Sequence, residues 1–186
     1  MNKLHRAAMV IAAFAIVGLT APAAPAAAAE PVDKHCVARA NVAEPQAICF
    51  DTFDKALQFA SGGVLYDLPK GSSVAAKVDA LNAKFGVNVV NTVISIEYTG
   101  SNHTGSDLIW VGQSGNCSTS TGNTDYTISS MPAGWDNVIT SYRAYANCWI
   151  KHFENTGHGG AVVGYEGARS YIGGALDNRT SSQRWS

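Results

Sequence analysis

The sequence has few charged residues and no concentration of charge of one sign. Asp, Glu, Lys and Arg make up 15% of its 186 residues, and the formal net charge is -1. Nucleic acid and anionic membrane surfaces are therefore excluded as partners, because no basic stripe exists that could release their counterions. The hydrophobic share of 46% is that of an ordinary globular protein rather than a disordered or fibrous one.

Motifs of catalysis and of zinc binding are also missing from the sequence. No G-x-S-x-G is present, and the many serines lack a recognisable base, so nucleophilic catalysis has no support. No C-x2-C spacing occurs, which argues against a zinc site built from thiolates. His152 and His158 lack the spacing and the acidic partner of a zinc metalloprotease. We therefore expect a protein that is not an enzyme.

A long apolar run is absent as well. The apolar residues 7–19 fall short of the roughly 20 residues that a helix needs to cross a bilayer. They follow a short basic start, Lys3 and Arg6, and precede Ala-rich sequence that offers small residues for cleavage. This pattern predicts that residues 1–29 are a secretory signal peptide and that the mature protein is secreted, with no membrane partner.

All four cysteines, Cys36, Cys49, Cys117 and Cys148, lie in the mature part of the chain. An even number of cysteines in an oxidising compartment indicates two disulfides. Three pairings exist, and we favour the sequential one. It closes a short loop near the N-terminus with the first two cysteines and a longer loop in the second half with the other two.

Helix signals are confined to residues 30–88. Asp51 can cap a helix that carries apolar residues on one stripe and ends at Gly62 and Gly63. A second helix begins at Ser72 or Ser73 and ends before Gly86. We see no catalytic constellation in this part. Residues 30–88 are therefore predicted to be a small disulfide-bearing α/β subdomain or a pro-region.

Residues 89–186 show a different pattern. Short alternating runs are separated by clusters of Gly, Asn and Ser, at residues 89–98, 107–111, 145–153 and 161–165. The predicted fold class is thus mainly β, with the small helical α/β subdomain preceding an all-β domain.

The all-β part contains an internal repeat, which is the most informative feature of the sequence. The first copy has Tyr98, His103 and Gly105, and the second has Phe153, His158 and Gly160 at the same offsets. A hexapeptide follows in each copy, residues 136–141 and 177–182. The aromatic, histidine and glycine suit a folded hairpin, in which the two rings stack and glycine adopts a conformation barred to other residues.

The first copy is longer than the second. The Ser-, Thr- and Gly-rich residues 117–125 are the obvious place for the additional residues. Loops of this composition stay at the surface and cost little entropy to lengthen. A bond between Cys117 and Cys148 would hold this long loop down.

Each hexapeptide concentrates a carboxylate, an amide and at least two hydroxyls. These are hard oxygen donors of the kind that calcium prefers. With one acidic residue per hexapeptide, most ligands would be neutral, and weak extracellular affinity is expected, from micromolar to around 10⁻³ M. The alternative for either hexapeptide alone is an Asx-turn without a metal.

The repeated hairpins and hexapeptides resemble the βγ-crystallin family. Both hexapeptides fit its calcium signature at every fixed position: two Asn or Asp residues, two variable residues, Ser or Thr, then Ser. The resemblance covers about residues 92–186 and implies a double Greek-key sandwich over residues 89–186, with each key lending a strand to the other's sheet. His103 and His158 stand where the family usually has an aromatic residue.

The resemblance also implies two Ca²⁺ sites at one end of the domain, shared between the copies. Transferred by position, the backbone carbonyls would come from Thr99, Glu154, Val138 and Arg179, the side-chain oxygens from Asn137 and Asn178, and the hydroxyls from Thr140 and Ser181. Asp136 and Asp177 either ligate the ion or brace the loop.

The function expected from this pattern is that of a secreted calcium-binding protein, in which the ion stabilises the fold and no catalysis occurs. An alternative on the same fold is a secreted inhibitor of metalloproteases, or a toxin-like protein, that docks an extracellular protein through the loop around Cys117. A third hypothesis is polysaccharide binding through Trp110, Trp135 and Trp185.

Overall fold

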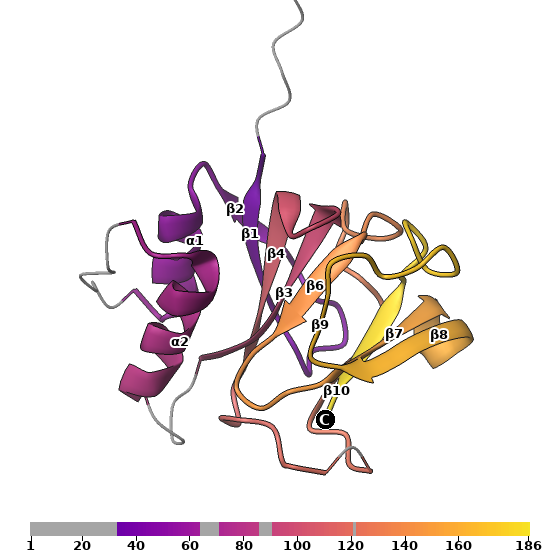
Figure 1. Ribbon diagram of the computed structural model, residues 1–186. Helices are drawn as coiled ribbons and strands as arrows, with labels where there is room; N and C mark the ends of the chain where they lie inside the picture. Colours follow the sequence, from indigo (N-terminus) through magenta and orange to yellow (C-terminus); the bar gives the residue numbers. More distant parts are fainter. Residues whose placement is uncertain (1–32, 64–70, 86–90, 121) are drawn as a thin grey trace, which may run out of the picture. The chain divides into compact units, whose positions relative to one another are not determined.

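Figure 1 shows the computed structural model of the protein, which describes residues 33–63, 71–85, 91–120 and 122–186. The predicted signal peptide, residues 1–29, lies outside the described residues. The strands are β1 (His35–Arg39), β2 (Ile48–Phe50), β3 (Thr92–Gly100), β4 (Thr104–Gly112), β5 (Tyr126–Ile128), β6 (Ser141–Ala144), β7 (Ile150–Asn155), β8 (Gly159–Glu166), β9 (Ala168–Arg169) and β10 (Ser182–Trp185). The helices are α1 (Phe53–Ala60) and α2 (Val74–Phe85), and a short 3-10 turn spans Thr156–His158.

The strands form two sheets, in the orders β2-β1-β4-β3-β6-β9 and β5-β10-β7-β8. We call β3 to β6 motif 1 and β7 to β10 motif 2. β5 belongs to motif 1 in the chain but lies in the sheet of motif 2, and β9 makes the reverse exchange. Each motif therefore lends one strand to the other's sheet. The predicted mainly β, double Greek-key, βγ-crystallin-like fold is confirmed by this strand order.

Two further strands extend the sheet of motif 1. β1 is parallel to β4, in a register that pairs His35 with Asp107 and Arg39 with Val111. β2 is antiparallel to β1 and forms the edge of the sheet. Figure 1 shows both helices beside this sheet. Residues 35–50 thus continue a sheet whose other strands lie beyond residue 89.

The two helices occur where the sequence predicted them, with one change at the first cap. The N-cap of α1 is Thr52, whose hydroxyl accepts the Lys55 N–H, whereas the Asp51 carboxylate binds the Lys55 ammonium instead. The expected cap at Asp51 was therefore wrong by one residue. Ser73 precedes α2 and accepts the Ala76 N–H at 3.2 Å, as a capping serine does. Neither described helix is long and apolar enough to cross a membrane.

Both disulfides follow the predicted sequential pairing. Cys36 and Cys49 face each other across β1 and β2, and Cys117 is bonded to Cys148. The second bond ties the loop between β4 and β5 to the segment before β7, as expected for the long insertion of the first copy.

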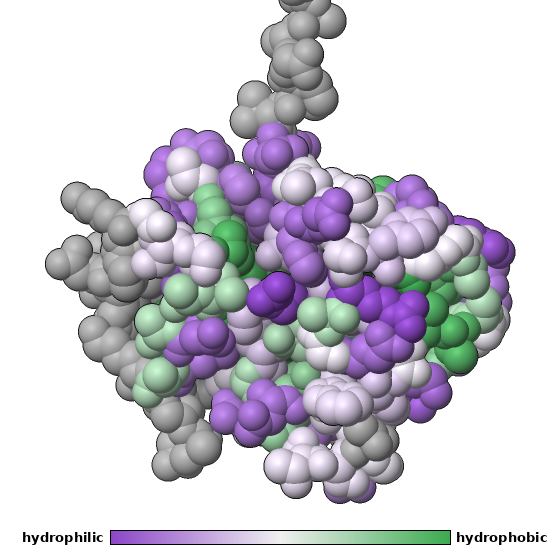
Figure 2. Space-filling model, viewed as in Figure 1, coloured by the Kyte–Doolittle hydropathy of each residue, from purple (hydrophilic) through white to green (hydrophobic). Residues whose placement is uncertain are grey.

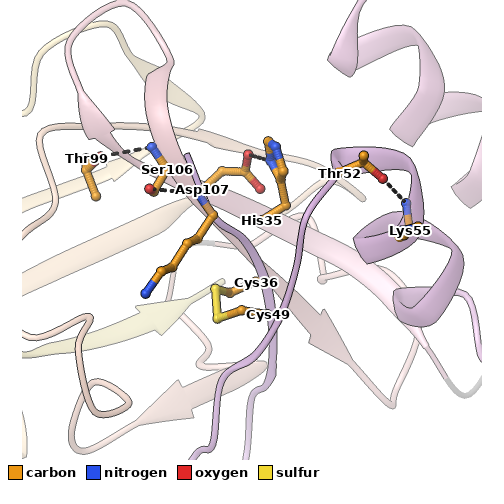
Figure 3. A network of polar contacts seen from close by, with 9 residues as sticks. His35, Cys36, Cys49, Thr52, Lys55, Thr99, Ser106 and Asp107 are labelled. Atoms are coloured by element: carbon orange, nitrogen blue, oxygen red, sulfur yellow. Dashed lines mark hydrogen bonds and ion pairs between the residues drawn. A yellow bond between two sulfur atoms is a disulfide. The ribbon is translucent and has the colours of Figure 1, made fainter. Parts of the chain in front are cut away.

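A polar network fastens β1 to β4 near the first disulfide (Figure 3). His35 Nδ1 lies 2.5 Å from Asp107 Oδ2. The Asp107 N–H donates to the Lys34 carbonyl, and the Lys34 N–H donates to Ser106 Oγ. Burial raises the pKa of the Asp107 carboxyl to about 6, although the His35 contact acts in the opposite direction.

Two clusters of buried side chains make up the core. One lies between the two sheets and includes Ile94, Leu108, Ile150 and Leu176, and the other joins β3 and β4 to the helices through Val37, Leu57, Ile96 and Ile109. Trp110, Trp135 and Trp185 are at most 5% exposed and belong to the first cluster. The hypothesis that these three tryptophans bind polysaccharide was therefore wrong, because their rings are occupied by packing.

A buried polar contact also connects the two sheets. His152 on β7 and Glu97 on β3 are both fully buried, and Nε2 of the histidine lies 3.1 Å from Oε2 of the glutamate. The Tyr142 ring packs on the His152 ring with centroids 4.3 Å apart. His152 is thus a core residue that helps join the motifs.

Candidate calcium corners

The two hairpins of the repeat have nearly identical geometry. The Tyr98 and His103 rings meet edge to face at 5.3 Å, and the Phe153 and His158 rings do the same at 5.1 Å. Both histidines have positive φ, 62° and 67°, and each is followed two residues later by a glycine with positive φ. A β-carbon on Gly105 would lie 2.6 Å from Thr99 Oγ1, so a side chain there would collide. The stacked hairpin predicted from the spacing is therefore present twice.

The last serine of each hexapeptide fastens its hairpin. Ser141 Oγ accepts the His103 N–H and donates to the Gly100 carbonyl. Ser182 Oγ accepts the His158 N–H and donates to the Asn155 carbonyl. Both serines are fully buried. Sequence reasoning did not assign a role to these two residues, although the fixed final serine of both hexapeptides was a usable signal.

Backbone hydrogen bonds place each hexapeptide against a hairpin and against the other hexapeptide. The Thr140 N–H donates to the Tyr98 carbonyl, and the Ser181 N–H donates to the Phe153 carbonyl. Thr140 therefore lies next to the hairpin that contains Thr99, and Ser181 lies next to the hairpin that contains Glu154. The hexapeptides are linked reciprocally, through Asn137 N–H to the Thr180 carbonyl and Asn178 N–H to the Ile139 carbonyl, both at 3.0 Å.

The first group of predicted donors, corner A, comprises Thr99, Thr140, Asp177, Asn178 and Arg179. Thr140 Oγ1 donates to Asp177 Oδ1 at 2.8 Å, so a hydroxyl of one hexapeptide meets the carboxylate of the other. The second oxygen of Asp177 lies 3.5 Å from the Tyr171 hydroxyl. The structure thus brings Thr140 and Asp177 together. Thr99 lies close by, because it follows Tyr98, whose carbonyl accepts the Thr140 N–H.

The second group, corner B, comprises Glu154, Ser181, Asp136, Asn137 and Val138. Ser181 Oγ donates to Asn137 Oδ1 at 3.4 Å, a longer contact than its counterpart in corner A. The exposed Asp136 carboxylate accepts the Asn137 side-chain amide at 3.1 Å. Asn137 and Asn178 both adopt positive φ, 59° and 54°, as asparagine in a tight loop readily does. Asp136 and Asn137 are therefore held in place by a contact within their own loop.

An ion pair lies beside corner B. The Arg179 guanidinium binds Glu154 Oε1, while Glu154 Oε2 accepts the Ala161 N–H at 3.0 Å. The Ala161 hydrogen bond, with help from Arg179, holds the pKa of the Glu154 carboxyl below its usual range. The Thr99 hydroxyl accepts the Ser106 N–H at the equivalent position of motif 1. Both side chains therefore stabilise their hairpins. This leaves the backbone carbonyls of Thr99 and Glu154 as the groups expected to bind the ion.

The hairpin histidines are engaged by the fold. His158 Nε2 lies 3.0 Å from the Ile128 carbonyl, and burial followed by the nearby Arg184 charge lowers the pKa of His158. His103 Nε2 lies 3.1 Å from the Tyr142 carbonyl. A carbonyl can only accept, so each Nε2 carries the proton in these contacts.

The chemistry of the two corners suits a hard cation. Within the described ranges, no group of three or more His, Cys, Asp or Glu side chains could hold a metal ion. Each corner instead pairs a hydroxyl with a carboxylate or amide oxygen from the other copy, and calcium accepts such mixed oxygen ligands at 2.3 to 2.6 Å. The residues present therefore fit calcium better than a metal that needs imidazole or thiolate ligands.

Among known proteins, the chain is distantly similar to solved βγ-crystallin domains. No protein-family model matches the sequence, and no curated relative matches it either. A βγ-crystallin domain from Clostridium beijerinckii is 15% identical, with a TM-score of 0.36 over 50% of this chain and 95% of that one. A βγ-crystallin domain from Flavobacterium johnsoniae is 17% identical, with a TM-score of 0.35 over 50% of this chain and 93% of that one.

A clostrillin double mutant in complex with nickel is 15% identical, with a TM-score of 0.37 over 50% of this chain and 95% of that one. Likeness at these identities concerns the fold alone. The strand order and the repeated hairpins define the class to which the structure belongs, a protein of βγ-crystallin fold with an N-terminal extension of one sheet.

Proposed function

We propose that this chain is a secreted calcium-binding protein of the βγ-crystallin type, in which Ca²⁺ stabilises the fold and no reaction is catalysed. The observation that carries the proposal is the reciprocal meeting of the two hexapeptides. Thr140 contacts Asp177 in one corner, and Ser181 contacts Asn137 in the other. Two disulfides and a predicted signal peptide support secretion.

Calcium bound in such corners would stabilise the domain through linkage. Each corner takes oxygens from both motifs, so its ligand set exists only when the motifs are docked. A ligand that binds only the folded state, present at about 100 times its dissociation constant, adds about 2.7 kcal/mol of stability. Weak extracellular sites would therefore still protect the protein where calcium is abundant.

Isothermal titration calorimetry with CaCl₂ on the mature protein tests the proposal. We expect two ions per chain and a melting temperature that rises with calcium and returns to its starting value with chelator. Thr140→Ala should remove the site at corner A, and Ser181→Ala the site at corner B, leaving one ion in each case. Ser129→Ala, an exposed hydroxyl outside both corners, is the matched control. A folded protein that takes up no calcium would refute the proposal.

The two corners should also differ in affinity. In corner A the oxygen that meets the hydroxyl of the other copy belongs to the Asp177 carboxylate, whereas in corner B it belongs to the neutral Asn137 amide. We expect Asp177→Asn to weaken the tighter binding step about tenfold or more, because calcium affinity follows the charge of its ligands. Asp136→Asn should have a smaller effect. Equal weakening by both substitutions would show that Asp136 is a ligand of the same rank.

A further inference from the structure

One tryptophan is exposed although the other three are buried. Trp149 is 49% exposed, whereas Trp110, Trp135 and Trp185 are at most 5% exposed. Polar and intermediate residues cover most of the face in Figure 2, with apolar patches near the helices and near β8. A single exposed aromatic ring is common on protein surfaces, so the surroundings of Trp149 decide whether it marks a site.

Trp149 borders a depression whose other lining residues have polar side chains. The depression has a volume of about 340 Å³, near the lower end of the range for small-ligand sites. Its lining comprises Ser118, Thr119, Asn147, Trp149 and Ser186. Thr119 and Asn147 supply groups that both donate and accept, and the Ser118 and Ser186 hydroxyls, which donate within the protein, remain acceptors beside one flat apolar ring.

The walls of the depression are fastened by covalent and hydrogen bonds. Trp149 exchanges two backbone hydrogen bonds with Ser186, at 2.8 and 3.0 Å. The adjacent Cys148 is bonded to Cys117, and Ser186 Oγ donates to the Ser120 carbonyl at 2.6 Å. A rigid site loses little conformational entropy when it binds.

The Asp125 carboxylate beside this loop is engaged by Ser118. Oδ2 of Asp125 accepts both the N–H and the hydroxyl of Ser118, each at 3.0 Å. Asp125 is not part of the lining, and no lining side chain is charged. A ligand rich in hydroxyl groups therefore matches the hydrogen-bonding groups of the depression.

We propose that the Trp149 depression binds a neutral carbohydrate, with the indole packed against the flat C–H face of a pyranose ring. Ser118, Thr119 and Asn147 then bind the hydroxyls at the edge of the ring. A flat face requires equatorial ring substituents, as in glucose and N-acetylglucosamine. A chain continues that face from ring to ring only when its links are equatorial as well, so the ligand class is β-1,4-linked polymers of these two sugars. This site differs from the three tryptophans predicted from the sequence, and it does not depend on calcium.

Binding is measured with the whole mature protein, by depletion on cellulose and on chitin and by titration with cellohexaose and chitohexaose. Maltohexaose, whose α-linkages do not present an extended flat face, is the comparison sugar. We expect saturable binding to one or both β-linked series and markedly weaker binding to maltohexaose, and the preferred series identifies the sugar unit. Trp149→Ala should lower affinity about tenfold or more, as truncation of a central aromatic contact does. Trp149→Phe should restore most of it.

Controls separate this site from folding and from the calcium corners. Phe59→Ala removes another exposed aromatic ring, 44% exposed on α1, and should leave sugar binding unchanged. Thr140→Ala should abolish one calcium site without altering sugar binding. Because Trp149 is the exposed tryptophan, acrylamide should quench its fluorescence selectively, and bound sugar should protect it.

Several results would overturn the assignment. Absence of binding to all four β-linked probes would do so, and so would a Trp149→Ala protein that binds as well as the original. Trp149 could also become protected from acrylamide quenching as the protein concentration rises, with no effect of added sugar. That result would instead place Trp149 in a contact between two copies of the chain.

Discussion

Motif 1 and motif 2 share one hairpin device but differ in what surrounds it. In both, a buried serine fastens a histidine hairpin, and a hexapeptide hydroxyl meets the other copy. The outer strand of motif 1, β4, is covered by β1, whereas the outer strand of motif 2, β8, lies at the edge of its sheet. The hairpins and hexapeptides, which have the same geometry in both motifs, therefore form the centre of the domain. The added strands β1 and β2 lie at the edge of one sheet.

One pair of equivalent positions shows how this difference is built. Asp107 follows Tyr98 at the same offset at which Val162 follows Phe153. Asp107 is 4% exposed under β1 and contacts His35, while Val162 is 50% exposed. A carboxylate thus lies in the covered strand and a valine in the open one, which is the reverse of what simple hydrophobic patterning predicts.

The largest expected effect comes from the disulfide that only motif 1 uses to hold its insertion. Replacing Cys117 and Cys148 by alanine should lower the free energy of unfolding by about 4 kcal/mol, because the bond closes a loop between residues 31 apart. The matching change at Cys36 and Cys49, which are 13 apart, should cost about 3 kcal/mol. Urea unfolding of both variants measures the difference. A larger loss at Cys36 and Cys49 would show that the N-terminal segment constrains the chain more than the insertion does.

The next effect concerns Asp107 and is visible as a dependence on pH. Burial raises the pKa of Asp107 to about 6, so the folded protein binds this proton more tightly than the unfolded chain does. Its contribution to stability is complete below a pH of about 4 and is lost as the pH rises through about 6. The contribution amounts to about 3 kcal/mol in total.

Asp107→Asn does not titrate, so its stability relative to the original protein should increase between these two pH values. Chemical unfolding at a series of pH values gives the difference directly. Val162→Asp places a carboxylate at the equivalent exposed position and should produce no such step. A flat difference for Asp107→Asn would contradict the proposed burial of the carboxyl.

The smallest effect tests whether the hairpin device is the same in both motifs. Ser141→Ala and Ser182→Ala each remove a hydroxyl that makes two hydrogen bonds in a buried place. Each should lower the free energy of unfolding by about 2 kcal/mol, because the backbone N–H of the histidine and a backbone carbonyl lose their hydrogen-bond partner. Thermal unfolding of the two variants should therefore agree closely. Markedly unequal losses of free energy would show that β1 or the insertion also stabilises the hairpin of motif 1.

Sequence reasoning was most successful where spacing alone carries the information. The positions of Tyr98 and Phe153 relative to their histidines and glycines predicted both hairpins, because a local backbone conformation is encoded locally. The disulfides followed from the order of the cysteines. It failed for Trp110, Trp135 and Trp185, since composition does not say which aromatic ring is covered, and it passed over Trp149, which the fold leaves exposed.

The repeat, the hexapeptide donors and the mainly β class were therefore set by the residues themselves, because each depends on short-range spacing and chemical type. The exchange of β5 and β9 between the sheets was implied by the family resemblance. Two features required the folded chain: the parallel pairing of β1 with β4, and the contact of Thr140 with Asp177. Each of these joins segments far apart in the sequence. Their pairing follows from which surfaces become buried together, and no local pattern records that outcome.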